Sequence, residues 1–242
     1  MKQDVVVLQR SNWSNAVGID RGTRTFGMTS EAEALEIPIK KILSLEKKIA
    51  KEQRNLSRKT KGSKNFEKQK VQVAKIHQKI VNVRKDSLHK LSHAVAKSHS
   101  IVVLENLKIK NMTASAKGTK ENPGKNVKAK SGLNRSIMRQ GWGEFGRQLS
   151  YKLAWSGGTF LEVPPHYTSQ TCPGCGHVAK ENRKNEAFNC VSCGYSGHAD
   201  VVGAINILER GRRLSVCGEV VPRVSKKLNL KKTSKKQKPM VA

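Results

Sequence analysis

The sequence contains few acidic residues, few aromatic residues and no long apolar run. Only 18 of its 242 residues are Asp or Glu, and aromatic residues make up 5%. No stretch approaches the roughly 20 apolar residues that a membrane helix needs, and the apolar run near the N-terminus is too short for a signal peptide. No strong amphipathic anchor for a membrane surface stands out either. These absences predict a cytoplasmic protein with no membrane partner, associated with the nucleoid if its source is bacterial.

Positive charge is what the sequence has in excess. It carries 47 Lys and Arg residues, a formal net charge of +29 and a pI near 10.2. A chain this basic repels itself unless a polyanion binds it, so nucleic acid is the first candidate partner, and DNA is the one we expect. The alternative is a basic surface that is merely solvated. The tail 222–239 is rich in Lys and Arg without any acid, and we expect it to be a disordered polycation.

Several short apolar segments are typical of β-strands. Residues 4–9 predict a short strand, and residues 15–30 predict a hairpin around a Gly-containing turn. A third short strand is expected at 33–37. Residues 100–106 form a buried apolar run, and 157–165 form another that two prolines close.

A long stretch of helical periodicity lies between these strands. Apolar residues recur at spacings of three, four and seven over 39–98, with a break at 58–65. This pattern predicts two antiparallel helices joined by a basic tip. The apolar stripe is expected to be packing, so only the basic face and the tip are candidates for phosphate contact. The stripe consists of Ile42, Leu45, Ile49, Leu56, Val73, Ile76, Ile80, Val83, Leu88, Leu91 and Val95.

The second half of the sequence alternates between polar and helical segments. Residues 108–135 have almost no bulky apolar side chains and predict a mobile loop, ordered only when a partner binds. Helical periodicity returns from Ile137, and residues 200–210 predict an apolar helix that Asp200 opens. The stripe of the first of these helices, expected to be core, is Met138, Trp142, Phe145, Leu149 and Leu153.

Four of the five cysteines form two CxxC pairs. They are Cys172, Cys175, Cys190 and Cys193. Each pair is followed by a glycine, and this spacing is typical of a ribbon whose two knuckles bind one tetrahedral Zn²⁺. Four thiolates leave no open position, so we expect one structural zinc. Cys217 is expected to be a spectator thiol, and His177 and His198 ordinary loop residues.

Three acids stand at the ends of apolar segments, where a bare charge is unfavourable. Asp20 ends the apolar run "AVGID", Glu105 ends "IVVLE", and Asp200 opens an apolar helix. Taken singly, each is explained by solvent exposure or, for Asp200, by helix capping. If the strands pair and the helix packs across them, the three converge. Such acids can hold two Mg²⁺ ions about 3.5–4 Å apart, and the ions can activate a water molecule that hydrolyses a phosphodiester.

The order of the motifs resembles a known family. The series "GIDRG", "IVVLENLKIKNM", "GLNRSIMRQGWGEFGRQLSYKLAWSGGTFLEVPPHYTSQTCPGCG" and "CVSCGYSGHADVVGAINIL" is similar to the C-terminal half of the TnpB (OrfB) family of insertion-sequence proteins, relatives of the type V CRISPR effectors. The resemblance covers about residues 15–210. It implies an α/β fold of the RNase H-like (RuvC-type) class, a mixed sheet flanked by helices, with a long helical hairpin and an inserted four-cysteine zinc ribbon.

The resemblance also implies roles for individual residues. By motif position Asp20, Glu105 and Asp200 correspond to the three RuvC carboxylates that bind Mg²⁺, and the four cysteines correspond to the zinc ligands. The family's activity is RNA-guided, Mg²⁺-dependent DNA cleavage, and older descriptions call its members transposases. DNA and a guide RNA are therefore the implied partners. Position 202 is Val, where many relatives have Asn.

The resemblance further predicts how the chain is divided. Family members carry a long N-terminal portion that grips the guide RNA and the target-flanking motif, and little precedes "GIDRG" here. We therefore expect a truncated member without programmable targeting. The expected parts are a remnant of the missing domain (1–14), the first part of the RuvC-like domain (15–166) with its hairpin (about 39–98), the zinc ribbon (167–197), the last RuvC-like motif and helix (198–214), and the basic tail (215–242).

Three hypotheses of function follow. The first is a RuvC-like DNA endonuclease, whose activity the expected truncation either spares or abolishes. The second is a catalytically inactive DNA- or RNA-binding relic or regulator with a structural zinc ribbon. The third is a DDE-type transposase that joins strands, which the TnpB resemblance disfavours. An inert binder has no need of the three acids, so their presence favours the nuclease. Nothing in the sequence indicates an oligomeric state.

Overall fold

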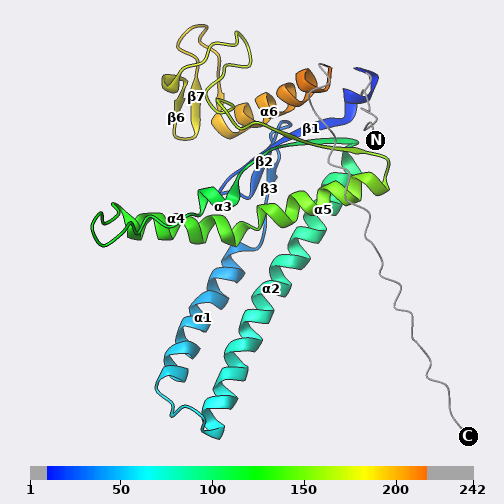
Figure 1. The fold of residues 1–242 in the computed structure, drawn as a ribbon. Helices are drawn as coiled ribbons and strands as arrows, with labels where there is room; N and C mark the ends of the chain where they lie inside the picture. Colours follow the sequence, from blue (N-terminus) through cyan, green and yellow to red (C-terminus); the bar gives the residue numbers. More distant parts are fainter. Residues whose placement is uncertain (1–9, 217–242) are drawn as a thin grey trace, which may run out of the picture.

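The fold is built on a five-stranded sheet, and the computed structural model describes residues 10–216. Figure 1 shows the sheet with one helix on one side and the long helices on the other. A 3₁₀ turn, η1 (Arg10–Asn15), leads into the sheet. The strands are β1 (Ala16–Arg21), β2 (Gly27–Thr29), β3 (Ala34–Leu35), β4 (Ile101–Glu105) and β5 (Thr159–Val163).

The order of the strands across the sheet is β3-β2-β1-β4-β5. β1, β2 and β3 form an antiparallel meander, whereas β4 is parallel to β1 and β5 is parallel to β4. Parallel neighbours require crossover connections, and helices supply them here. This mixed sheet with helices on both faces is the RNase H-like fold that the sequence predicts. The strand expected at 4–9 and the basic tail lie outside the described residues.

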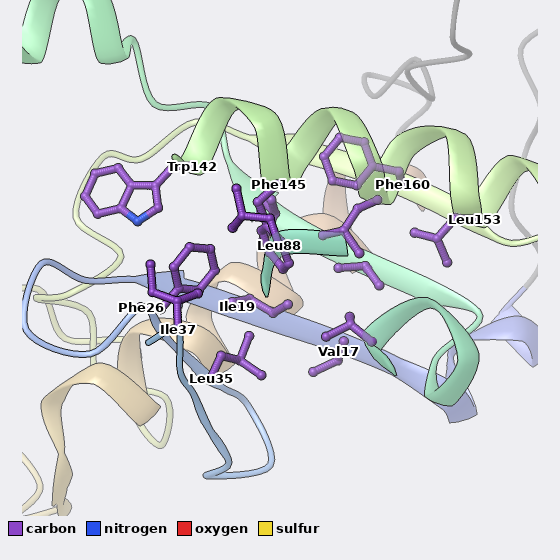
Figure 2. Close-up of a cluster of buried hydrophobic side chains, with 14 of the residues drawn as sticks. Val17, Ile19, Phe26, Leu35, Ile37, Leu88, Trp142, Phe145, Leu153 and Phe160 are labelled. Carbon is purple, nitrogen blue, oxygen red and sulfur yellow. The ribbon is translucent and has the colours of Figure 1, made fainter. Parts of the chain in front are cut away.

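Alternation along the strands gives the sheet two apolar faces. On one face, Val17 and Ile19 of β1 pack with Phe145, as Figure 2 shows. On the other face, Val103 of β4 packs with Ile207 of the last helix. All five side chains are almost completely buried. Both faces of the central strands are therefore core, which explains why these strands read as continuous apolar runs.

The predicted helical hairpin extends away from the sheet (Figure 1). Its helices are α1 (Ile39–Ser57) and α2 (Lys64–Ser98). The side chains buried between them are Ile42, Ile49, Ile76 and Ile80. Ser63 begins α2, because its hydroxyl accepts a hydrogen bond from the backbone N–H of Phe66 (3.1 Å). The far half of α2 returns to the sheet, where Leu88 and Val95 join the core.

The prediction of a mobile loop over 108–135 is wrong for both ends of that segment. The helices there are α3 (Ile109–Met112) and α4 (Val127–Gln140). Polar side chains tie α4 to the preceding segment: Lys130 donates to the carbonyl of Met112 (2.6 Å), and Asn134 donates to that of Thr113 (2.8 Å). A helix held by such hydrogen bonds needs few apolar residues, so its composition resembles that of a loop.

The helix predicted from Ile137 onward is in fact two helices. Gly141 adopts a left-handed conformation (φ 75°) and separates α4 from α5 (Trp142–Trp155). Because the break changes the direction of the apolar stripe, Met138 is 64% exposed and is not a core residue. The remaining predicted positions are buried: Trp142, Phe145, Leu149 and Leu153.

A small second sheet is inserted between β5 and the last helix, α6 (Ala199–Val216). It is antiparallel, with the order β6-β7-β8, and Figure 1 places it beside α6. Its elements are a 3₁₀ turn, η2 (Lys180–Asn182), β6 (Arg183–Lys184), β7 (Ala187–Asn189) and β8 (Ser196–His198). This is the predicted four-cysteine ribbon. No helix within residues 10–216 is both long and apolar enough to cross a membrane.

Candidate active site and metal centre

Asp20 and Glu105 lie next to each other at the carboxyl ends of two parallel strands. β1 and β4 pair with Ile19 opposite Leu104, so the following residues, Asp20 and Glu105, are neighbours. Alternation places both side chains on the same face as Val103, which is the face that α6 covers. The carboxyl ends of parallel strands are where sheets of this kind bind ligands.

The helix α6 brings Asp200 to the same place. Two glycines allow α6 to approach β1 closely. A Cβ at Gly18 would lie 2.2 Å from the carbonyl oxygen of Ala204, and a Cβ at Gly203 would lie 2.7 Å from Oδ2 of Asp20. Asp200 is in the first turn of the helix, one turn before Gly203. The missing Cβ atoms therefore set the spacing between the strand that carries Asp20 and the helix that carries Asp200.

All three predicted acids line one open cavity of about 630 Å³. The loop after β1 (residues 22–25), the loop around Thr168 and residues of the ribbon form most of the rest of its wall. The carboxylates do not converge as tightly as the thiols of the ribbon. Within residues 10–216, the four cysteines are the only group of three or more candidate ligands that comes so close together.

Burial and mutual repulsion make the cluster of acids electrostatically unfavourable. Burial raises the pKa of Asp20 from 3.8 to about 7, and the charges of Glu105 and Asp200 contribute to the rise in the same direction. The positive charges of Arg183 and Arg21 oppose this rise. A cation in the cavity would relieve the repulsion, so the cluster is suited to hold one.

Glu105 is buried and has partners that the sequence did not reveal. Burial raises the pKa of its carboxyl group, while the hydroxyl of Thr168 and the charges of Arg21 and Arg210 lower it. The Thr168 hydroxyl donates to Oε1 of Glu105 (2.5 Å), and the guanidinium of Arg21 donates to its backbone carbonyl. A single Thr in a polar loop carries no periodic signal, so Thr168 was missed.

Asp200 is held by the ribbon. Arg183 of β6 donates to Oδ1 of Asp200 (2.8 Å), and both side chains are about one-third exposed. The backbone N–H of Asp200 donates to Nδ1 of His198, which lines the cavity. A second contact joins Arg24, in the loop after β1, to Glu186 of the ribbon (2.5 Å). Neither arginine has a local signal in the sequence, because Arg183 reaches the cavity only through the folded ribbon and Arg24 lies in an irregular loop.

The four predicted cysteine ligands come together in the ribbon. Their Sγ atoms all lie within 4.8 Å of one another. The Sγ atoms of Cys172 and Cys193 are 3.6 Å apart, as are those of Cys175 and Cys190. The cluster can hold one metal ion.

The two knuckles have the same backbone geometry. The N–H of Gly176 donates to the carbonyl of Cys172 (2.9 Å), and the N–H of Gly194 donates to that of Cys190 (3.0 Å). Both glycines have left-handed φ angles, 77° and 75°. The glycine after each CxxC pair therefore closes a turn that most L-residues adopt only with strain.

The ribbon and α6 share one apolar cluster. Phe188, at its centre, is fully buried. The cluster consists of Cys172, Phe188, Cys190, Ala199 and Val202. Val202 thus packs against the ribbon. The packing links the cysteine knuckles to the first turn of α6, which carries Asp200.

An RNase H-like sheet with a four-cysteine ribbon inserted before its last helix defines the class of protein, and comparisons with known proteins identify the family. Residues 2–116 match the family model OrfB_IS605, described as "Probable transposase". Residues 142–207 match the model "Cas12f1-like, TNB domain". The chain belongs to the OrfB/TnpB family, as the sequence predicts.

Several curated proteins are similar to the chain over most of its length. It is 50% identical over 209 residues to an Escherichia coli (strain K12) protein named "Putative RNA-guided DNA endonuclease InsQ", covering 86% of this chain and 52% of that protein. It is 32% identical over 228 residues to a "Putative RNA-guided DNA endonuclease" of Streptomyces pristinaespiralis, covering 94% and 53%. The chain thus spans about half the length of these relatives.

Among solved structures, the chain is similar to one titled "Cryo-EM structure of the Cas12f1-sgRNA-target DNA complex". The TM-score is 0.49 and the sequence identity is 20%. The match covers 79% of this chain and 48% of that one.

Proposed function

We propose that the chain carries the DNA-cleaving site of a TnpB-like RNA-guided endonuclease of the kind also described as a transposase. The observation that carries the proposal is that acids from β1, β4 and α6 line a single cavity. The names of the relatives, which describe them as putative RNA-guided DNA endonucleases, agree with it. In this proposal Asp20, Glu105 and Asp200 are the catalytic residues, and the reaction is hydrolysis of a DNA phosphodiester.

Mg²⁺ fits the donor set of the cavity. Mg²⁺ prefers carboxylate oxygens. Burial, together with the charges of Glu105 and Asp200, raises the pKa of Asp20 to about 7, and a cation would offset both effects. We propose that Asp20, Glu105 and Asp200 hold two Mg²⁺ ions. When bound, such ions polarise the phosphodiester and make water a stronger nucleophile. Arg183 and Arg24 line the same cavity and supply donors for the phosphate oxygens beside the acids.

Zn²⁺ fits the geometry of the four thiols. Tetrahedral ligands at about 2.3 Å from a zinc ion are about 3.8 Å apart. Two of the Sγ pairs are 3.6 Å apart, and no pair exceeds 4.8 Å. We propose one structural zinc held by Cys172, Cys175, Cys190 and Cys193. Four protein ligands leave no open position for catalysis.

The proposal also covers the domains of the chain and its binding partners. We propose that 15–166 and 198–214 form one nuclease domain and that 167–197 is the inserted ribbon. DNA is the substrate and a guide RNA is the second partner. The net charge of +29 supports a polyanionic partner, and binding that depends on phosphate contacts should weaken steeply with added salt.

Cleavage of labelled single-stranded DNA by the purified, zinc-loaded chain tests the proposal. We expect cutting that requires Mg²⁺ and that falls by more than about 100-fold in Asp20→Ala, because even supporting residues of a metal site are worth 10–100-fold. Asp86→Ala is the matched control, since Asp86 lies on α2 and is exposed. Cleavage by Asp20→Ala at the parent's rate would contradict the assignment.

A binding measurement on the same samples separates the two main hypotheses. A parent chain that binds DNA at low salt but does not cut it, with Mg²⁺ present, would support the nucleic-acid-binding relic or regulator. Equal DNA binding by the parent and Asp20→Ala, with cutting by the parent alone, supports the nuclease.

A further inference from the structure

The loop between β5 and the ribbon is fastened to α6 by two side chains. Asn206 of α6 donates both hydrogens of its amide group, one to the carbonyl of Thr168 (2.8 Å) and one to that of Thr171 (2.7 Å). One turn further along the helix, Arg210 donates to the carbonyls of Pro164 (2.6 Å) and His166 (2.7 Å). Four carbonyl groups of one short loop are thus bound from a single face of α6.

The loop needs this support because its backbone is strained. Tyr167 has a left-handed φ of 58°, and the N–H groups of Gln170 and Thr171 both donate to its carbonyl. A bulky residue in this region persists only where the surroundings hold it. The bonds from Asn206 and Arg210 flank Tyr167 on both sides.

The same loop delivers a hydroxyl to the cavity. Thr168 is 4% exposed, and its Oγ1 lies 2.5 Å from Oε1 of Glu105. The other acceptor in reach, the carbonyl of Pro165, is farther away at 3.2 Å. A hydroxyl has one hydrogen to donate, so the shorter contact to Glu105 takes it. This hydrogen bond fixes one carboxylate oxygen of Glu105 and so restricts rotation about the side-chain bonds of Glu105.

We propose that Thr168 is a positioning residue for Glu105, and that Asn206 and Arg210 of α6 hold Thr168 in place. This inference rests on the proposed function in treating Glu105 as a metal ligand. One helix then orients two of the three acids: Asp200 directly, as part of its own first turn, and Glu105 through the clamped loop. Hydrogen-bonding partners of ligands commonly set metal affinity in this way.

Metal binding by the zinc-loaded chain without nucleic acid tests the role of Thr168. The probe is Mn²⁺, titrated calorimetrically, and the relevant binding is the part that Asp20→Asn abolishes. We expect Thr168→Val, which keeps the shape but removes the hydroxyl, to weaken this binding by about 10-fold or more. Thr168→Ser, which restores the hydroxyl, should bind within about threefold of the parent.

Hydrogen exchange of the same zinc-loaded chain tests the clamp independently of any metal in the cavity. We expect Asn206→Ala and Arg210→Ala to speed amide exchange in residues 166–171, while exchange in β7 and β8 is unchanged. Arg213→Ala is the matched control, because Arg213 lies on the same helix, is 78% exposed and pairs with Glu209. It should leave exchange in the loop unchanged.

The outcomes separate the inference from the proposed function. Thr168→Val binding Mn²⁺ as tightly as the parent, or Thr168→Ser losing as much as Thr168→Val, overturns the positioning role. Unchanged loop exchange in Asn206→Ala overturns the clamp. A parent chain with no Asp20-dependent Mn²⁺ binding contradicts the proposed function and with it the role assigned to Thr168, whereas the exchange experiment still decides the clamp.

Discussion

At the scale of single residues, the acids of the cavity oppose the stability of the metal-free fold. Asp20 is buried beside Glu105 and Asp200, and two arginines only partly offset the repulsion, so its pKa rises to about 7. A carboxyl group that prefers to be protonated when folded lowers stability once it ionises. The arrangement is understandable if a divalent cation completes it.

Asp20→Asn should therefore stabilise the zinc-loaded chain in magnesium-free buffer. The folded pKa of about 7 exceeds the ordinary 3.8, so the folded parent binds a proton more tightly and loses stability as pH rises from about 4 through 7. At pH 8 the free energy of unfolding of Asp20→Asn should exceed that of the parent by about 2–4 kcal/mol. The difference should vanish below about pH 4. Urea unfolding at both pH values measures it.

An exposed acid on the surface is the control for this experiment. Asp86→Asn, at an exposed position on α2, should leave the free energy of unfolding nearly unchanged at both pH values. Adding Mg²⁺ should reduce the advantage of Asp20→Asn, because the ion stabilises only the parent. Equal stability of Asp20→Asn and the parent at pH 8 would show that the cavity imposes no such penalty.

The sequence could identify residues with a local signal and no others. Asp20, Glu105 and Asp200 stand at the ends of apolar segments, and their shared cavity depends only on strand pairing and on α6 packing across the sheet. Thr168 contacts Glu105 across 63 positions of sequence, and Arg183 reaches Asp200 across 17. Such partners have no pattern of their own, because a folded loop or ribbon creates the contact.

At the scale of elements, the contact between α6 and β1 depends on the absence of side chains. A Cβ at Gly18 would meet backbone atoms of α6, which cannot move without moving the helix. At Gly203 it would meet the flexible end of Asp20. The two positions therefore predict different consequences for the same substitution.

Gly18→Ala should destabilise the fold. Its Cβ would lie 2.2 Å from the carbonyl oxygen of Ala204, so α6 must shift away from the sheet, and we expect the free energy of unfolding to fall by about 3 kcal/mol or more. Gly132→Ala, in α4 with open space around it, should raise that free energy by about 0.5–1 kcal/mol through helix propensity. Urea unfolding of both variants checks the contrast, and a stable Gly18→Ala would contradict the close packing.

Gly203→Ala should separate activity from stability. The new Cβ would displace the carboxylate of Asp20, while the gain in helix propensity offsets part of the strain. We expect the free energy of unfolding to change by less than about 1 kcal/mol and the rate of Mg²⁺-dependent cleavage to fall by about 10–100-fold, as for a misplaced catalytic group. Cleavage rates and urea unfolding on the same preparation are compared. Unchanged cleavage would mean that the cavity tolerates a displaced Asp20.

Elements with an apolar stripe or run were predictable, and a helix held mainly by polar contacts was not. The hairpin follows from periodic residues such as Ile42 and Ile76, which pack in one cluster. The first part of α4, residues 127–135, was mistaken for a loop because none of these residues is buried. The break at Gly141 was missed because apolar spacing continues across it, although the left-handed glycine changes the direction of the chain.

At the scale of the whole molecule, the ribbon and the five-stranded sheet are not independent. The cluster around Phe188 spans both the ribbon and the first turn of α6, and Arg183 of the ribbon contacts Asp200. The order β3-β2-β1-β4-β5 agrees with the fold implied by the resemblance. The sequence could not predict which residues of the ribbon face the cavity. The CxxC spacing predicts the two knuckles, but it does not predict how they pack on α6.

Loss of zinc should therefore affect the cavity as well as the ribbon. Cys190→Ser should bind less than the one zinc per chain expected of the parent. It should also speed hydrogen exchange in residues 199–203 and reduce Mg²⁺-dependent cleavage by about 10-fold or more, because Asp200 loses its support. Helical circular dichroism should be largely retained, since α1 and α2 pack against each other elsewhere. Zinc content, exchange and cleavage are measured together.

A histidine of the ribbon is the control for this variant. His177 lies outside the thiol cluster, although its carbonyl accepts a hydrogen bond from the N–H of Cys172. His177→Ala keeps that carbonyl and should keep the zinc and the cleavage rate. If Cys190→Ser loses zinc but keeps the hydrogen-exchange and cleavage rates of the parent, the ribbon does not support the cavity.

The insertion of the ribbon between β5 and α6 also has a consequence for folding. Docking of the last helix closes the long segment 164–198 into a loop, and closing a flexible chain costs entropy that grows with its length. A metal ion that joins residues 172 and 193 shortens the effective loop and lowers that cost by about 1 kcal/mol. A bound metal ion would thus favour the docking of α6 on the sheet, the step that brings Asp200 to Asp20 and Glu105.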